Sequence, residues 1–380
     1  MKKFALLLGF ATLATGITGC YGSNVTETGA INKYTLEAFA DVEPLAENVE
    51  FNVGVLSGST HGFSSYLIEK LGGYEHANID AEIIVFSTGP ILVEAMVSGD
   101  CDAGAYGLGG VLAGTIGQGF VNLGAIARDY HTLQIYSPND SEMVAAGEGA
   151  QIPGVYGTAD DWRGKDVYLP VGSTLHYMLG VGLAKLGLST DDIKITHMDV
   201  QNVNTALRAG KCDIGGLWHN YPYGDINEQA TPIMTAEDVD VTLMACFAAP
   251  GDVVADPEKM PVIEKWMELY FAAVDWMYAS DENLSLATDW FLEWNDSNGI
   301  SSEYDEVSAH LKYQKLLTLE ENVEMFHTPS DAGEFSKLVE YNVLPLEFYV
   351  EQGSYREKDI ATFLEPQYFD SSVIDKLVAK

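Results

Sequence analysis

The chain contains two copies of one sequence pattern, and this duplication restricts its possible fold more than any other feature. Residues 58–61 read Gly-Ser-Thr-His, and residues 172–176 read Gly-Ser-Thr-Leu-His. Each copy follows a short apolar run and precedes a helix-like segment that ends in Lys-Leu-Gly. A later stretch is also repeated, because residues 94–104 (EAMVSGDCDAG) correspond to residues 205–215 (TALRAGKCDIG). Two copies of one strand–loop–helix unit predict two similar α/β lobes.

We expect the two Gly-Ser-Thr segments to be ligand-binding turns. In open α/β sheets, the loops that follow the strands carry the ligand. The unpaired N–H groups of a helix N-terminus, together with serine and threonine hydroxyls, form an uncharged donor pocket for an anionic or polar head group. Two such turns therefore predict the two jaws of one cleft. The alternative is that both turns only cap the helices they precede.

The charge of the chain excludes one large class of partners. It has 20 basic and 56 acidic residues, which give a formal net charge of −36. A nucleic-acid-binding protein needs a basic footprint, so no nucleic acid is expected as a partner. A polybasic patch for anionic lipid headgroups is equally disfavoured.

Motifs for metal binding and for catalysis are missing from the sequence. The four cysteines form no Cys-x-x-Cys pair, and the eight histidines show no metal-ligand spacing, so neither a metal nor another cofactor is expected. Cys101 and Cys212 occupy matching places in the repeats, where small buried residues are the expected interpretation. There is no Gly-x-Ser-x-Gly elbow, phosphate-binding loop or dinucleotide-binding Gly-x-Gly-x-x-Gly motif, so the protein is not expected to be an enzyme.

The N-terminus has the pattern of an export signal. Lys2 and Lys3 precede an apolar run that is shorter than the roughly 20 residues needed to span a bilayer. The following Ile-Thr-Gly-Cys sequence resembles the lipobox of bacterial lipoproteins, in which the cysteine, here Cys20, carries the lipid. We therefore predict a signal peptide at 1–19 and a lipid-anchored tether at 20–47, on a protein exposed outside the cytoplasm.

The remaining chain is predicted to divide between the lobes. Residues 48–137 and 246–380 are assigned to the first lobe, which includes a helical C-terminal part, and residues 138–245 are assigned to the second. A strand near residues 242–247 is expected to return to the first lobe and complete a two-strand hinge. Residues 139–165 are expected to be an irregular entry to the second lobe.

The candidate ligand-binding residues lie in the loops that follow the predicted strands. His61 and His176 are expected to be neutral hydrogen-bond donors rather than general bases. Trp218 and Tyr221 could cover a ligand or could pack against the hinge. The candidates of the first jaw are Ser57, Ser59, Thr60, His61, Ser87, Thr88, Gly89, Tyr106 and Gly107, and those of the second are Ser173, Thr174, His176, Asn202, Trp218 and Tyr221.

Several segments resemble the substrate-binding lipoproteins of ABC importers, in the branch that handles nitrate, sulfonates, taurine and thiamine-pyrimidine precursors. The resemblance rests on 172–177 (GSTLHY) and 206–210 (ALRAG) in the second lobe, and on 86–90 (FSTGP) and 95–102 (AMVSGDCD) in the first. It covers roughly residues 50–250. It implies the type II periplasmic-binding-protein fold, in which two α/β lobes joined by a two-strand hinge close on a solute. It also implies a membrane permease as the partner, driven by a separate ATPase.

The resemblance sets the expected function, with two departures. Residues 139–165 are longer than the usual connection, and no arginine or lysine lies in a candidate loop. With neutral donors alone we expect a ligand larger than nitrate, with a polar head, sulfonate-like or other, and with or without an aromatic ring. The protein is expected to be a monomeric, lipid-anchored solute-binding component of an ABC importer. The alternatives are an enzyme on the same scaffold, such as a pyrimidine-precursor synthase, and an envelope-tethered sensor.

Overall fold

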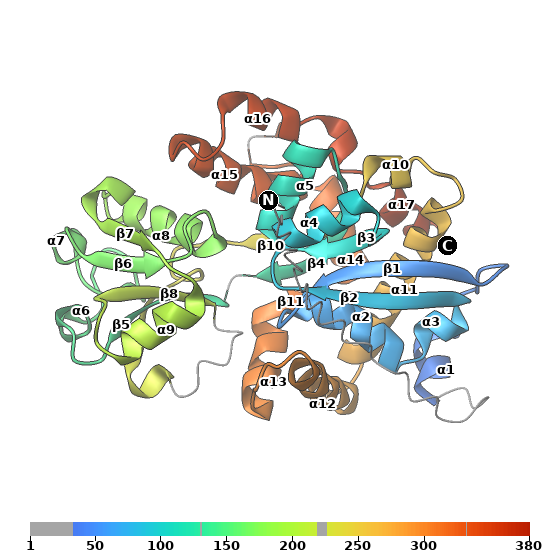
Figure 1. The fold of residues 1–380 in the computed structure, drawn as a ribbon, viewed down its shortest axis with the longest axis horizontal. Helices are drawn as coiled ribbons and strands as arrows, with labels where there is room; N and C mark the ends of the chain where they lie inside the picture. Colours follow the sequence, from blue (N-terminus) through green and yellow to red (C-terminus); the bar gives the residue numbers. More distant parts are fainter. Residues whose placement is uncertain (1–32, 130, 219–225, 332) are drawn as a thin grey trace, which may run out of the picture. The chain divides into compact units, whose positions relative to one another are not determined.

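The fold is built on two β-sheets that share one internal arrangement (Figure 1). The computed structural model describes residues 33–380 except residues 130, 219–225 and 332. Sheet A has six strands, and sheet B has five. In spatial order, sheet A contains β11 (Gln314–Leu316), β4 (Val121–Asp129), β10 (Leu243–Ala249), β3 (Ala103–Tyr106), β1 (Val49–Leu56) and β2 (Ile79–Phe86). Sheet B contains β7 (Lys194–His197), β6 (Asp166–Leu169), β8 (Ile214–Trp218), β5 (Leu133–Pro138) and β9 (Ala230–Thr235).

The sequence repeat is visible as two equivalent sets of parallel strands. In sheet A, β1 lies between β2 and β3 and runs parallel to both. In sheet B, β6 lies between β7 and β8 and runs parallel to both. An antiparallel strand follows each set, namely β10 beside β3 and β5 beside β8. Because the carboxyl ends of parallel strands share one edge of a sheet, the loops that follow the three strands of each set are brought together.

Helices connect the strands of both repeats. Those of the first are α2 (Thr60–Lys70), α3 (Gly73–His76), α4 (Gly89–Ser98) and α5 (Leu108–Gln118). The part of the chain that contains the second repeat has α6 (Glu142–Ala146), α7 (Ala159–Trp162), α8 (Thr174–Lys185) and α9 (Val200–Arg208). Residues 139–165, predicted to be irregular, therefore hold two short helices.

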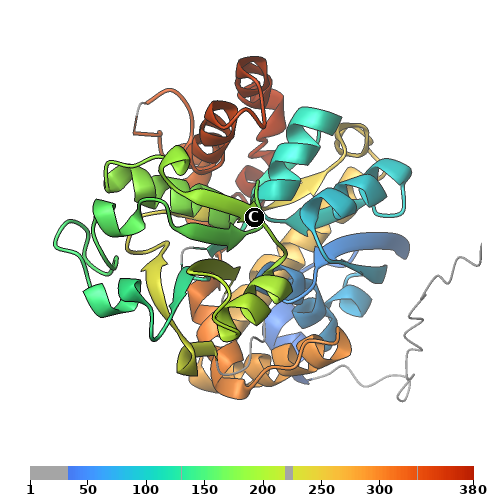
Figure 2. The same cartoon turned by 60° about the vertical axis from the view of Figure 1, so that its left-hand side comes forward.

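The C-terminal part of the chain is mainly helical. Its helices are α10 (Gly251–Val254), α11 (Met260–Tyr278), α12 (Asp281–Ser297), α13 (Tyr304–Tyr313), α14 (Leu319–His327), α15 (Lys337–Glu351), α16 (Glu357–Phe363) and α17 (Ser372–Val378). Helix α11 packs on sheet A, where Trp266 and Tyr270 meet Phe247 edge to face. Helices α15 and α16 lie beside α5, as both views show (Figures 1 and 2), and α15 also contacts α8. The C-terminal region thus touches elements of both repeats.

The chain crosses between the sheets twice, and the first crossing differs from the prediction. The sequence placed the crossover near residues 137–138, with residues 133–136 still in the first lobe. In the structure, β5 belongs to sheet B, where Leu133 pairs with Trp218, so the chain crosses between β4 and β5. The second crossing, between β9 and β10, returns the chain to sheet A as predicted. A side-chain contact joins the crossings, because His131 Nδ1 lies 3.0 Å from Glu237 Oε2.

Part of the predicted tether is packed onto the fold. Residues 33–39 form α1, and Phe39 and Val42 are buried in the same apolar cluster as α11. The Thr35 hydroxyl also donates to the Leu71 carbonyl oxygen (2.7 Å). The ordered fold therefore begins before residue 48, because burial of these apolar side chains outweighs the polar character of their neighbours.

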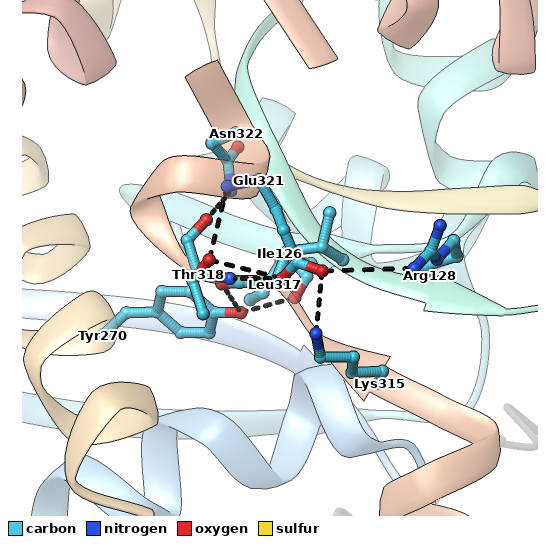
Figure 3. A network of polar contacts seen from close by, with 8 residues as sticks. All are labelled: Ile126, Arg128, Tyr270, Lys315, Leu317, Thr318, Glu321 and Asn322. Carbon is cyan, nitrogen blue, oxygen red and sulfur yellow. Dashed lines mark hydrogen bonds and ion pairs between the residues drawn. The ribbon is translucent and has the colours of Figure 1, made fainter. Parts of the chain in front are cut away.

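A network of polar contacts joins helices α11 and α14 to β4 and to β11, the edge strand of sheet A (Figure 3). The Tyr270 hydroxyl lies within hydrogen-bonding distance of the main-chain oxygens of Ile126 and Leu317, which share its single proton. The Asn322 amide group donates to the Ala125 oxygen (2.8 Å), and its own oxygen accepts from the Ala125 N–H (2.7 Å).

Within the described part of the chain, no helix combines the length and apolar character needed to cross a bilayer.

Candidate functional site

The first Gly-Ser-Thr turn connects β1 to α2. Gly58 has φ +67°, a left-handed conformation that favours glycine. The Ser59 hydroxyl accepts a hydrogen bond from the Gly62 N–H (3.0 Å) and donates to the Leu56 carbonyl oxygen (2.9 Å). Ser59 is therefore the N-cap of α2, and its hydroxyl is used within the turn.

Thr60 and His61 point into the interior rather than toward solvent. The Thr60 N–H and hydroxyl both lie 2.9 Å from Gln314 Oε1, and the hydroxyl lies 2.8 Å from the Gln314 main-chain oxygen. His61 is 4% exposed and neither ring nitrogen has a hydrogen-bond partner. Burial lowers the pKa of His61 to about 3, which keeps the ring neutral near pH 7, but the ring donates no hydrogen bond. Both side chains were candidates for ligand contact, but this placement makes them structural residues.

The loop after β2 lies next to the first turn. The Ser57 N–H donates to the carbonyl oxygen of Phe86, the last residue of β2 (3.0 Å). Ser87 and Thr88 are exposed at the start of α4, and the Thr88 hydroxyl makes no capping hydrogen bond. These two hydroxyls are therefore available to a ligand at the same sheet edge as the first turn.

The loop after β3 lies at the same sheet edge as the loops after β1 and β2, but the Tyr106 side chain is not exposed there. A Cβ added at Gly89 would lie 2.6 Å from the main-chain nitrogen of Gly110, so glycine permits α4 and α5 to begin close together. Gly107 is the N-cap of α5, and a Cβ added there would meet no atom within 4 Å. Tyr106 is fully buried, and a Cβ added at Gly110 would meet its ring at 2.5 Å. The expectation for Tyr106 is corrected, because its ring lies beneath α5.

The second Gly-Ser-Thr turn connects β6 to α8 in the same way. Gly172 has φ +79°, which matches Gly58 of the first turn. Ser173 is the N-cap of α8, but its buried hydroxyl makes no capping bond and has no hydrogen-bond partner. The hydroxyl of Thr174 accepts a hydrogen bond from Trp218 Nε1 (2.8 Å). The half-buried Trp218 ring is thereby held beside the start of α8, so three sequence candidates meet here.

The main chain of the second turn is held from outside the repeat. The Tyr349 hydroxyl in α15 donates to the Ser173 carbonyl oxygen (2.7 Å). His176 is buried, and its Nδ1 accepts from the Gly172 N–H (3.3 Å). Its ring meets Phe348 edge to face, and burial lowers its pKa, so a neutral His176 accepts within the turn through Nδ1 and carries its proton on Nε2.

One predicted residue that the structure describes does not join these clusters. Asn202 is exposed in the first turn of α9, where its N–H donates to Asp199 Oδ1 (3.1 Å), the N-cap of that helix. Capping therefore accounts for its position. Tyr221 and the predicted lipidation site Cys20 lie outside the described residues.

A continuous route of direct contacts leads from the first turn to the first crossover. Gln314, bonded to Thr60, also donates from Nε2 to Asp129 Oδ2 (3.1 Å) at the end of β4. Asp129 accepts from the Thr132 hydroxyl (2.6 Å) and from the Thr132 N–H (3.2 Å). Burial raises the pKa of Asp129 to about 6, although these hydrogen bonds oppose the shift.

The same route continues to the second turn. Thr132 precedes Leu133, the first residue of β5, which pairs with Trp218 at the end of β8. Trp218 in turn donates to Thr174. The two Gly-Ser-Thr turns are thus linked through side chains and one strand pair at the crossover between the sheets.

Gln314, Asp129 and Tyr349 were not among the sequence candidates. None of them lies in a repeat motif, and Gln314 meets Thr60 across 254 positions of the chain. Tyr349 meets Ser173 across 176 positions. No local pattern in the sequence could have indicated these long-range contacts.

The three cysteines among the described residues are not activated as nucleophiles. Cys101, Cys212 and Cys246 are buried and free, and burial raises the pKa of each thiol to about 12. A thiol with so high a pKa is a poor nucleophile. In the part of the chain that is described, no group of three or more histidine, cysteine or acidic side chains is arranged to hold a metal ion.

Comparisons with known proteins support the fold and the type of protein. No family profile matches the chain. A Brucella abortus protein named "Putative binding protein" is 26% identical over 302 residues, which cover 78% of this chain and 86% of the relative. A Brachyspira hyodysenteriae protein named "Putative ABC transporter periplasmic binding protein" is 23% identical over 190 residues, or 49% of this chain and 53% of the relative.

Solved structures of solute-binding proteins have the same fold. The aliphatic sulphonate-binding protein SsuA of Escherichia coli aligns with a TM-score of 0.62 at 17% identity, over 83% of this chain and 97% of SsuA. The nitrate-binding protein NrtA of Synechocystis PCC 6803 aligns with a TM-score of 0.62 at 11% identity, over 89% of this chain and 90% of NrtA. The chain therefore has the periplasmic-binding-protein fold, and the predicted α/β architecture and the resemblance to this group are confirmed.

Proposed function

We propose that this protein is the extracytoplasmic solute-binding component of an ABC importer. It captures a small organic solute between the lobes built on sheets A and B and delivers it to a membrane permease. The observation that carries the proposal is the pair of equivalent Gly-Ser-Thr turns at the carboxyl ends of two parallel strand sets, linked through the crossover. The names of the relatives and structural neighbours support the same function.

The chemistry of the turns favours a solute with a polar or anionic head. The candidate loops contain neither lysine nor arginine, so recognition depends on main-chain N–H groups, on the hydroxyls of Ser87, Thr88 and Ser173, and on helix dipoles. Each helix start contributes about 0.3–1 kcal/mol to anion binding. A micromolar dissociation constant requires about 8 kcal/mol. Several helix starts must therefore act together, and burial of an apolar part of the solute supplies the rest.

The binding free energy that neutral donors can supply favours a solute larger than nitrate. Small ligands gain at most about 1.5 kcal/mol per non-hydrogen atom, so a four-atom anion bound by neutral donors would reach only about 6 kcal/mol. An organic sulfonate provides the same kind of oxyanion head and an additional apolar part. The Trp218 ring beside the start of α8 is suited to cover the apolar part of the solute, whether that part is aliphatic or aromatic.

Closure of the lobes follows from the placement of the turns. A solute that contacts both turns is bound most tightly when they approach each other, so its binding favours the closed arrangement. We further propose that residues 1–19 direct export and that lipid on Cys20 retains the protein at the outer face of the cytoplasmic membrane.

A thermal-shift screen tests the proposal. The panel contains alkanesulfonates, taurine, nitrate, amino acids and pyrimidines. A solute at a hundredfold excess over its Kd should stabilise the protein by about 2.7 kcal/mol. The proposal predicts a specific response to a polar-headed organic solute. A panel without any stabilising compound, together with turnover of one of its members, would favour the enzyme alternative.

A further inference from the structure

Each Gly-Ser-Thr turn is held by one side chain that comes from the C-terminal region and lies outside both repeats. Gln314 of β11 holds the first turn, and Tyr349 of α15 holds the second. The repeats alone therefore do not determine the shape of the binding edge. The duplicated turns have separate supports of different chemistry.

The support of the first turn is buried and has several contacts. Gln314 is 6% exposed, and its side-chain oxygen accepts from both the N–H and the hydroxyl of Thr60, the residue at the start of α2. Its main-chain oxygen lies 2.8 Å from the same hydroxyl, whose single proton is shared between the two acceptors. Removal of the side chain would leave the Thr60 N–H without an acceptor in the interior, which is costly.

Gln314 is itself held in position. It pairs with Asp129 in the sheet and donates to its carboxylate (3.1 Å). Strand β11 is also attached to its surroundings by the network in Figure 3, in which Lys315 and Glu321 form an ion pair (2.7 Å) and Tyr270 donates to Leu317 (3.0 Å). These contacts therefore fix the Gln314 side-chain oxygen in the orientation in which it accepts from Thr60.

The support of the second turn leaves the serine hydroxyl unused. Tyr349 is 2% exposed, and its ring packs against Phe348 and near His176. Its hydroxyl bonds to the main-chain oxygen of Ser173 and not to the Ser173 hydroxyl. The N-cap of α8 is thus oriented through its main chain, and its hydroxyl keeps its hydrogen-bonding capacity.

We infer that Gln314 and Tyr349 are positioning residues of the solute site, each of which fixes one Gly-Ser-Thr turn in its binding conformation. A site held close to its bound geometry loses less conformational entropy when a ligand binds. The inference gives the C-terminal region a function in binding. It rests on the proposed solute-binding function, but the conformation of the turns can be measured without a ligand.

The test of Tyr349 compares two variants that each remove one contact between α15 and the part of the chain around α8. Tyr349→Phe removes the hydrogen bond to Ser173 and keeps the ring. Gln352→Leu removes the contact between Gln352 and the Thr190 hydroxyl (2.9 Å), which lies away from the turn, and serves as the control. Amide hydrogen exchange of residues 172–174 is measured without ligand, and the Kd for ethanesulfonate is measured by calorimetry.

Tyr349→Phe should accelerate exchange in residues 172–174 and weaken ethanesulfonate binding by about tenfold, the equivalent of 1.4 kcal/mol, whereas Gln352→Leu should leave both near wild type. Unchanged exchange in Tyr349→Phe, or equal effects in both variants, would overturn the inference for this turn. Failure of ethanesulfonate to bind the wild type would count against a sulfonate as the solute. Amide exchange would still decide the positioning role.

The test of Gln314 uses a loss and a rescue. Gln314→Leu removes the acceptor of the Thr60 N–H, so that amide should exchange at least about tenfold faster, as expected when a hydrogen bond worth about 1.4 kcal/mol is lost. The double variant Gln314→Glu/Asp129→Asn exchanges the amide and the carboxylate. It keeps an acceptor for Thr60 and a donor–acceptor contact between positions 314 and 129.

The double variant should restore protection of the Thr60 amide and ethanesulfonate affinity to near wild type. Gln134→Leu removes a glutamine side chain of β5 that donates to the His131 oxygen (3.2 Å) and accepts from the Tyr136 hydroxyl (2.5 Å), and it should change neither quantity. Wild-type exchange of the Thr60 amide in Gln314→Leu would overturn the inference. If Gln314→Leu fails to fold, the rescue variant decides, because a folded double variant with an unprotected Thr60 amide contradicts the proposed role.

Discussion

Replacement of Ser173 by alanine should weaken solute binding without lowering the stability of the protein. A serine N-cap usually stabilises its helix, and its change to alanine costs about 0.5–2 kcal/mol. The Ser173 hydroxyl makes no capping bond, is buried and has no partner. Ser173→Ala should therefore lack the loss of stability that usually follows removal of a serine N-cap. Because an unsatisfied buried polar group costs about 1–3 kcal/mol, Ser173→Ala should leave the free energy of unfolding unchanged or raise it slightly.

The same substitution should weaken binding if the hydroxyl contacts the solute. A hydrogen bond to a charged group contributes about 1.5–3 kcal/mol, and each 1.4 kcal/mol changes the dissociation constant tenfold. For an anionic head group, the Kd of Ser173→Ala should therefore rise by about one to two orders of magnitude. Urea unfolding without solute and calorimetric titration with the best compound of the panel give the two quantities.

Ser59→Ala provides a matched control in the other repeat. The Ser59 hydroxyl caps α2 through Gly62 and also donates to Leu56. Its removal should lower the free energy of unfolding by about 1 kcal/mol, the usual value for an N-cap. An equal loss of stability in Ser173→Ala, or wild-type affinity in that variant, would refute the assignment of a free hydroxyl to the second turn.

Three further substitutions test other parts of the structure. Trp218→Phe removes the hydrogen bond to Thr174 (2.8 Å), so solute affinity should fall several-fold with a stability loss of about 1 kcal/mol, measured by calorimetry and by urea unfolding. His61→Leu should flatten the acid side of the stability profile. Because the pKa of His61 is lowered to about 3, the unfolded chain binds more protons between pH 6.5 and 3, and stability falls as pH falls through this window. At pH 4.5 the variant should avoid a loss of about 2–3 kcal/mol seen in the wild type by urea unfolding. Asn322→Leu leaves the buried N–H and oxygen of Ala125 without partners and should lower the free energy of unfolding by about 2–4 kcal/mol in a thermal melt, whereas an unchanged melt would contradict the importance of these two hydrogen bonds.

The sequence repeat predicted the architecture because each copy contains the residues that a strand, a tight turn and a helix start need locally. A Gly-Ser-Thr segment between an apolar run and a helical run needs a left-handed glycine and a helix start, and both appear at Gly58 and Gly172. The matching strand orders β2–β1–β3 and β7–β6–β8 follow from the same local units. Local patterns could not place β5, because consecutive apolar runs give no information about which sheet each strand joins.

The roles of individual side chains depend on distant residues. Thr60 and Ser173 occupy neighbouring positions of equivalent turns, but Gln314 uses the hydroxyl of Thr60, and Tyr349 leaves that of Ser173 unpaired. Tyr106 seemed suited to a ligand from its place after a strand, and the close start of α5 covers it. The Phe39 region was assigned to the tether because residues 21–47 as a whole are polar and only weakly periodic.

A two-dimensional amide NMR titration tests the central claim most directly. The compound that gives the largest thermal stabilisation is added to isotopically labelled protein, and the amides of residues 58–60 and 172–174 are followed. We predict that both groups shift together and yield a single Kd, because one solute contacts both turns. Shifts confined to one turn, or saturation of the two turns at different concentrations, would contradict the account.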